Sequence, residues 1–153
     1  EPKRRYWLKG EVDFSDTSFD PFSAQVVREG TDATIVAYGP LVPVALAAAE
    51  AAVEDGRSIE VIDLRSISPL DVPTVAASVA KTGRLIVAHE APTFGGMGGE
   101  LAAAITERCF YSLQAPVIRV GGYYMPYPVS RVEEEYVPDI DRILEAVDRA
   151  FDY

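Results

Sequence analysis

The chain has few of the residues on which catalysis and metal binding most often depend. It holds one cysteine, Cys109, and one histidine, His89, among 153 residues. A single cysteine excludes a disulfide within the chain and any metal cage of several cysteines, and a single histidine excludes every site that needs two imidazoles. The Gly-x-Ser-x-Gly turn of serine hydrolases is also missing. Much of the usual catalytic repertoire is therefore absent.

Positive charge and long apolar runs are scarce as well. The chain carries 14 Lys and Arg against 24 Asp and Glu, a formal net charge of −10 at pH 7. Nucleic acids and anionic membrane surfaces are bound mainly by clustered Lys and Arg, so neither partner is expected. No apolar run approaches the roughly 18 residues that cross a bilayer, and residues 1–10 are too polar and basic for a signal peptide. We expect a soluble cytoplasmic protein.

The N-terminal part of the chain differs from the rest in composition. Residues 1–9 hold four basic side chains against one acidic side chain, and residues 12–23 mix Asp, Pro, Ser and Thr without periodicity. We expect residues 1–23 to be a linker leaving an upstream domain, and residues 24–153 to form one domain. A start on Glu1 without methionine suggests a fragment of a longer protein.

From residue 24 onward, short apolar runs alternate with segments of helical period. Buried strands are expected at 33–38, 59–64, 84–89 and 116–120, with an antiparallel edge strand at 24–29. Four amphipathic helices are expected from the stripes Val42/Leu46/Ala49/Val53, Val75/Val79, Leu101/Ala104/Ile105/Cys109 and Ile140/Ile143/Leu144/Val147/Phe151. Asp71 is expected to cap the second helix, and Gly56 and Gly83 to end the first two. The alternation predicts an α/β fold in three α/β/α layers with a mostly parallel sheet.

Ligands of open parallel sheets bind outside the carboxyl ends of the strands. There the sequence places His89 beside Glu90, a pair that could move protons. No nucleophile for His89 to activate is evident, so a role in orienting loops at a strand end is the favoured interpretation and a catalytic role the alternative. The glycine run at 95–99 completes no phosphate-binding motif, and close packing against another subunit or domain is its favoured interpretation.

The C-terminal third of the chain has the composition of a contact surface. Residues 121–129 are dense in tyrosine and proline, including Tyr123 and Tyr127, which suggests an ordered loop built to contact a partner. The segment 131–153 holds eight acidic side chains and three arginines, half of the net charge. Such a charge run is a solvated face or a docking site for a basic partner.

Several motifs in order resemble the C-terminal part of the β subunit of thiamin-diphosphate-dependent 2-oxo acid dehydrogenases. They are the His-Glu-Ala-Pro run at 89–92 with the glycines up to Glu100, the run at 113–120, Gly122-Tyr123 with Pro126 and Pro128, the run at 136–138, the run at 61–69 with Asp71, and Lys81-Thr82-Gly83. Even residues 1–4 look like the junction leaving that family's pyrimidine-binding domain. The first and third motifs look closer to the branched-chain than to the pyruvate enzymes.

The resemblance implies a transketolase C-terminal-type fold. It also implies that the whole α2β2 enzyme decarboxylates a 2-oxo acid on thiamin diphosphate and magnesium and passes the acyl group to a lipoyl arm. The family's catalytic histidine and cofactor-contacting glutamate belong to the upstream domain, so this chain is expected to hold no catalytic, cofactor or metal residue and to be inactive alone.

Interface building and docking are what the resemblance leaves to this domain. The expected partners are the α subunit, a second β subunit and the basic subunit-binding domain of the dihydrolipoyl acyltransferase. The candidate interface and docking residues are His89, Glu90, Gln114, Tyr123, Tyr127, Glu133, Glu134, Glu135 and Tyr153. Relatives often carry an acid where this chain has Gln114, and many have Asp in place of Tyr124.

Two alternative functions stay open at this point. One is the equivalent domain of a pyruvate dehydrogenase β subunit or of another transketolase-like thiamin enzyme. The other is a free-standing α/β module that binds a ligand at the strand ends around His89.

Overall fold

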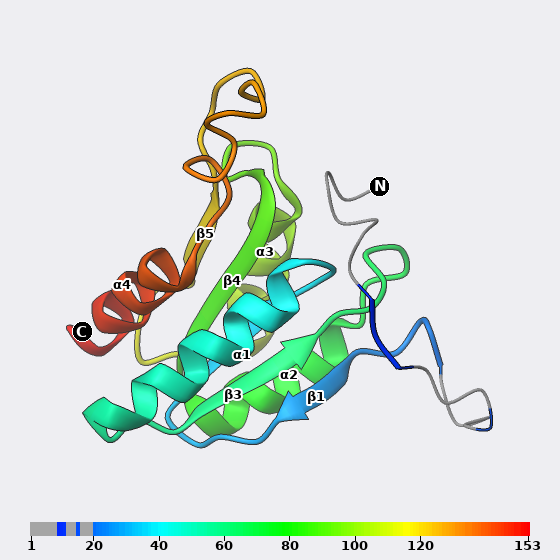
Figure 1. The fold of residues 1–153 in the computed structure, drawn as a ribbon. Coiled ribbons are helices and arrows are strands. Elements are labelled where there is room, and N and C mark those ends of the chain that lie inside the picture. Colours follow the sequence, from blue (N-terminus) through cyan, green and yellow to red (C-terminus); the bar gives the residue numbers. More distant parts are fainter. Residues whose placement is uncertain (1–8, 12–14, 16–19) are drawn as a thin grey trace.

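The computed structural model describes residues 9–11, 15 and 20–153 and shows a sheet with helices on both faces (Figure 1). The strands are β1 (Gln25–Arg28), β2 (Ala33–Ala37), β3 (Ile59–Asp63), β4 (Leu85–Pro92) and β5 (Ile118–Gly122). The helices are α1 (Leu41–Ala51), followed by a 3-10 turn η1 (Ala52–Asp55), α2 (Val72–Thr82), α3 (Met97–Cys109) and α4 (Ile140–Phe151). Most of the expected linker lies outside the described residues. No helix in the described part is long and apolar enough to cross a membrane.

The sheet has the predicted mixed topology. Its strand order is β1-β3-β2-β4-β5, and every pair is parallel except β1 with β3. All five residues of β2 are buried, as expected for a central strand covered on both faces. The predictions of an α/β fold, five strands and an antiparallel edge strand are confirmed.

The two faces of the sheet bury separate apolar clusters. One cluster joins α1 and α4 to the sheet through residues such as Ile35, Ile86 and Val147. The other joins α2 and α3 to the opposite face through residues such as Val36 and Leu101. Successive side chains along β2 thus point to opposite layers, which is the pattern a strand gives to a two-sided core.

Local signals set the helix ends as the sequence predicts. Asp71 caps α2 by accepting a hydrogen bond from the Thr74 amide at 3.1 Å. Gly56 and Gly83 adopt the left-handed conformation at φ 72° and 74°, where a side chain would cost energy, and end η1 and α2.

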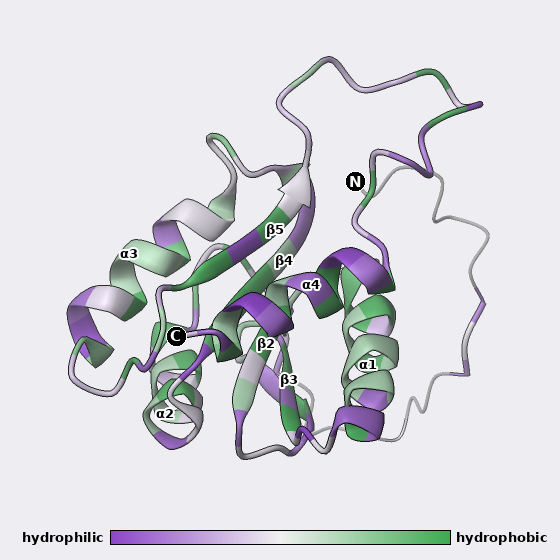
Figure 2. Ribbon diagram, turned by 90° about the vertical axis from the view of Figure 1, so that its left-hand side faces the viewer, coloured by the Kyte–Doolittle hydropathy of each residue, from purple (hydrophilic) through white to green (hydrophobic). Residues whose placement is uncertain are grey.

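The apolar stripe of α1 lies one residue away from the predicted one. Val53 is 51% exposed, and Val42 and Leu46 are only partly buried, whereas the fully buried residues are Leu41, Ala45, Ala48, Ala49 and Ala52. Alanines let the helix approach the sheet closely, and the larger side chains flank the contact. Figure 2 shows α1 as mostly hydrophobic all round, which is why periodicity alone misplaced its buried face.

Candidate functional site

The carboxyl ends of the parallel strands gather the residues that the sequence singles out. His89 and Glu90 lie near the end of β4, where the pairing with β5 is irregular between Ala88 and Pro92. Extra residues at this point re-aim side chains that a regular ladder would alternate. The predicted strand-end position of His89 is therefore accompanied by a local distortion of the sheet.

His89 is fully buried and tied to its own loop. Its Nδ1 lies 2.8 Å from the Ala91 carbonyl oxygen, and its Nε2 is buried with no hydrogen-bond partner among the described residues. Because a carbonyl only accepts, Nδ1 carries the proton. Burial lowers the pKa of His89 below its ordinary value of 6.5. A neutral, enclosed imidazole of this kind fits the orienting role better than proton transfer.

Gly96 and Gly98 of the glycine run, together with Gly121 of β5, pack against His89 of the same chain. A Cβ built on Gly96 would lie 2.7 Å from Cε1, one on Gly98 would lie 2.5 Å from Nε2, and one on Gly121 would lie 3.0 Å from Cε1. At Gly98 the imidazole alone fills the space of the missing side chain, and at Gly96 and Gly121 the carbonyl oxygens of Pro92 and Ala91, the latter at 2.7 Å, lie closer still. These contacts lie within the chain, and packing of the glycine run against another subunit or domain stays a prediction.

A long loop between β5 and α4 covers the same edge. Residues 123–139 hold no regular element, yet they are tied down by ring contacts. The ring centroid of Tyr136 lies 6.3 Å from that of Tyr123 and 5.1 Å from that of Tyr127, and both pairs are edge to face. The Tyr136 ring also packs against Gly122, which has no side chain. Long ordered loops without helices or strands are usually functional. The tyrosine-rich loop that the sequence predicts is therefore ordered by its own aromatic residues.

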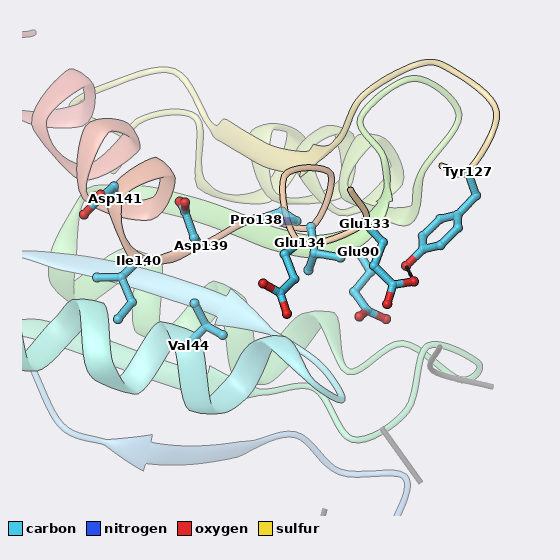
Figure 3. Close-up of a pocket in the computed structure, with 10 residues that line it drawn as sticks. Val44, Glu90, Tyr127, Glu133, Glu134, Pro138, Asp139, Ile140 and Asp141 are labelled. Carbon is cyan, nitrogen blue, oxygen red and sulfur yellow. Dashed lines mark hydrogen bonds between the residues drawn. The ribbon is translucent and has the colours of Figure 1, made fainter. Parts of the chain in front are cut away.

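A pocket of about 590 Å³ opens between this loop and the first turns of α1 and α4 (Figure 3). Its apolar lining is Val44, Tyr127, Val137, Pro138 and Ile140, and its charged lining is Glu90, Glu133, Glu134, Asp139 and Asp141. No lysine or arginine lines the pocket in the part of the chain that the structure describes. Concave walls of one sign concentrate potential, so the pocket favours cations.

The acidic run at 133–135 does not form one solvated face. Glu133 is only 7% exposed, and its Oε2 accepts a hydrogen bond from the Tyr127 hydroxyl at 3.4 Å, whereas Glu134 and Glu135 are exposed. Asp139, which caps α4 by accepting from the Arg142 amide at 2.9 Å, faces the pocket too. The sequence assigned Asp139 and Asp141 to the helix dipole alone. Binding sites of α/β folds form where helices begin beside the carboxyl ends of strands. By that rule the sequence could have predicted Asp139 and Asp141 as lining residues of the pocket.

Gln114 and Tyr153 lie at the opposite edge of the sheet. Gln114 donates its backbone amide to the Gly83 carbonyl at 2.8 Å, and the adjoining Arg84 donates to the Ala150 carbonyl at 2.9 Å, near the C-terminus. At about 1.5 Å per residue, α4 separates this edge from the acidic pocket by roughly 18 Å. Figure 1 shows the C-terminus and the 123–139 loop at different ends of the molecule. The nine predicted interface residues therefore fall into two groups.

The pocket does not fit the cofactor that the resemblance implies for the whole enzyme. Among the described residues that line the pocket, a diphosphate would meet five carboxylates and no cation, and the carboxylates would repel it. Among the described residues, no group of three or more His, Cys, Asp or Glu side chains could hold a metal ion. We therefore assign no step of thiamin diphosphate or magnesium chemistry to this edge.

Comparison with known proteins agrees with these features. Residues 23–143 match the family model of the transketolase C-terminal domain. The whole chain aligns with 45% of the length of the β subunit of the pyruvate dehydrogenase E1 component of Leifsonia xyli subsp. xyli, and 55% of the aligned residues are identical. A second alignment covers 97% of this chain and 43% of the 3-methyl-2-oxobutanoate dehydrogenase β subunit of Mycobacterium tuberculosis, with 49% identity. The chain thus spans less than half the length of these relatives.

Solved structures show the same architecture. A split-gene transketolase, described as an inactive β4 tetramer, matches 94% of this chain and 46% of its own with a TM-score of 0.75 and 30% identity. The fold, the ordered motifs and these relatives agree. The chain belongs to the transketolase C-terminal domain family, and the relatives that it matches along its length are β subunits of 2-oxo acid dehydrogenases of the pyruvate and branched-chain types.

Proposed function

We propose that the chain is the C-terminal domain of a 2-oxo acid dehydrogenase β subunit that serves assembly and docking and leaves the chemistry to other domains. The observation that carries this proposal is the carboxyl edge of the sheet. In this fold class ligands bind there, but here buried His89 occupies the space behind the loops, and the pocket at this edge is lined by carboxylates. The whole enzyme, a cytoplasmic α2β2 assembly, would bind thiamin diphosphate and magnesium and pass an acyl group to a lipoyl arm.

Calorimetry tests the absence of cofactor chemistry in this domain. Thiamin diphosphate with magnesium is titrated into this chain alone and into the assembled α2β2 enzyme. Stoichiometric heat is expected from the assembled enzyme and none from the chain. Tight, stoichiometric binding by the chain itself would overturn the proposal.

Within this family we further propose the branched-chain type. The His-Glu-Ala-Pro run at 89–92 and the Gly122-Tyr123 pair support it, and relatives named for 3-methyl-2-oxobutanoate and 2-oxoisovalerate share 49% and 44% identity with the chain. The 55% identical relative carries a pyruvate dehydrogenase name and supports the alternative. The assembled enzyme should show a higher kcat/KM for 3-methyl-2-oxobutanoate than for pyruvate, and the reverse order would favour the pyruvate type.

For docking of the acyltransferase's basic subunit-binding domain, we propose the edge that holds Gln114 and Tyr153. The resemblance places Tyr153 near that contact. At position 114 relatives often carry an acid, an ion-pair partner that Gln114 does not supply. The Gly83-Arg84 pair brings both parts of the chain to one edge. Glu133, Glu134 and Glu135, which the sequence places among the docking candidates, lie about one helix length away, so we propose a separate face for them.

A free-standing ligand-binding module is less well supported. The relatives with 44–55% identity are more than twice the length of this chain, and their matching part is the β subunit segment described above.

A further inference from the structure

A second, aromatic surface is left over at the carboxyl edge. Phe94 and Tyr124, from the loops after β4 and β5, are 69% and 75% exposed and pack against each other with ring centroids 4.6 Å apart. Tyr123 and Met125 beside them are about half exposed. Exposed aromatic clusters on an otherwise charged surface mark contact sites.

The two loops form a fixed platform. The Arg119 guanidinium donates to the Thr93 carbonyl at 3.1 Å, and the Thr93 amide donates to the Gly122 carbonyl at 3.3 Å. His89 fills the space beneath both loops. A surface held in this way loses little conformational entropy on binding, so it is preorganised for a partner.

The aromatic platform continues into the acidic pocket. Tyr123 contacts Tyr136, Tyr136 contacts Tyr127, and the Tyr127 hydroxyl reaches Glu133 in the pocket wall. The aromatic platform and the acidic pocket are therefore connected through the buried ring of Tyr136, and we call the two together the carboxyl-edge face.

The chemistry of the carboxyl-edge face selects an arginine- or lysine-bearing partner. The apolar lining of the pocket, such as Val44 and Ile140, can cover the methylene stem of a long basic side chain while Glu134 and Asp141 meet its charged head. The neighbouring Tyr123 ring already receives a guanidinium, since Cζ of Arg142 lies 4.7 Å from its centroid.

The negative charge of the carboxyl-edge face also excludes a dimer in which two copies of the chain bind each other through this face. A two-fold dimer places the same patch of both subunits in contact, and here it would bring two sets of five carboxylates together. Like charges opposed across an interface disfavour association strongly. The occupant must therefore present a surface of opposite charge.

We propose that the carboxyl-edge face binds a basic polypeptide segment, which inserts an arginine or lysine into the pocket and lays an apolar side chain on Phe94 and Tyr124. This face lies apart from the edge proposed for acyltransferase docking. The two proposals can therefore fail independently.

The test uses the assembled enzyme and a fluorescent peptide in which arginines alternate with tryptophan and leucine. Binding is followed by fluorescence anisotropy, and a matched peptide carries neutral citrulline in place of arginine. Glu134→Arg and Phe94→Ala should each weaken binding of the arginine peptide about tenfold. The citrulline peptide should bind at least about tenfold more weakly to the unchanged enzyme.

Glu107→Arg provides the matched control. Glu107 is an exposed acid near the C-terminal end of α3, at the other edge, and its reversal changes the net charge by the same amount. Binding should stay unchanged in this variant. Equal weakening by Glu107→Arg and Glu134→Arg, or equal affinity for the arginine and citrulline peptides, would overturn the proposal.

Discussion

The imidazole of His89 occupies the space that a side chain on Gly98 would need. A Cβ at Gly98 would lie 2.5 Å from Nε2 of His89, and Gly98 is the second residue of α3. The strand that ends near His89 and the helix that begins beside it are therefore locked by one buried ring against a bare backbone. This contact fixes where α3 starts and where the loops of the carboxyl-edge face lie.

Gly98→Ala should therefore destabilise the domain, whereas Gly99→Ala, at the next position, should stabilise it. Overpacking against a buried ring costs about 1 to 3 kcal/mol. Gly99 lies in the same helix, but its Cβ would meet only the end of the Arg119 side chain at 3.4 Å. Gly99→Ala should thus stabilise by about 0.5 to 1 kcal/mol, because alanine is the better helix former. Urea unfolding of both variants measures the difference, and equal effects would contradict the contact.

Stability should fall on mild acidification because of His89. Burial lowers the pKa of His89 in the folded chain, so the unfolded chain binds the proton more tightly. The contribution to stability is complete above the ordinary value of 6.5 and is lost as the pH falls towards the folded pKa. His89→Asn removes the titrating group, so its free energy of unfolding should change less between about pH 7.5 and 5.5. Parallel pH profiles of both proteins would contradict this assignment.

The ion pair of Glu60 and Lys81 should stabilise the fold because Lys81 neutralises the buried carboxylate of Glu60. Glu60 is 1% exposed and hydrogen-bonds Lys81, whose side chain is 43% exposed. Burial raises the pKa of Glu60, but the hydrogen bonds from Lys81 and Ser78 outweigh it, and the pKa ends below its ordinary 4.5. Lys81→Met should lower the free energy of unfolding by about 2 kcal/mol, because it leaves a buried carboxylate without its cation. The loss is smaller than for a fully buried pair because water screens the half-exposed Lys81.

A double-mutant cycle separates the charge of Glu60 from its packing. Glu60→Gln in the Lys81→Met background should recover part of the lost stability, since no unpaired charge is then buried. Strictly additive effects of the two substitutions in urea unfolding would show that the pair is not coupled. The stability that depends on the Glu60 charge should be present above about pH 4.5 and decline as the pH falls through the lower folded pKa.

Local patterns were sufficient for most of the fold. Strands such as β2 and β4 follow from continuous apolar runs, and the ends of α2 follow from Asp71 and Gly83, because caps and turns depend on neighbouring residues. The buried face of α1 did not follow, since a helix rich in Ala and Val has no clear polar side and the sheet selects its alanines.

The candidate site was predictable only in part. His89 and Glu90 lie in the last part of β4, and Tyr123 and Tyr127 lie in the loop after β5, as the sequence predicts. Sequence distance does not show that Gln114, which precedes β5, lies at the same edge as the end of α4. Nor does it show that Glu133 turns inward to Tyr127 while its neighbours face solvent. Both facts depend on tertiary packing, which groups residues by edge of the sheet and not by position in the chain.

The central claim, a docking domain apart from the chemistry, is tested most directly by separating docking from decarboxylation in the assembled α2β2 enzyme. Affinity for the acyltransferase's subunit-binding domain and decarboxylation with an artificial electron acceptor are measured for Gln114→Lys, for removal of Tyr153 and for Glu134→Lys. We predict about tenfold weaker docking for the first two, unchanged docking for Glu134→Lys, and unchanged decarboxylation for all three. Impaired decarboxylation with intact docking, or a loss of docking confined to Glu134→Lys, would contradict the account.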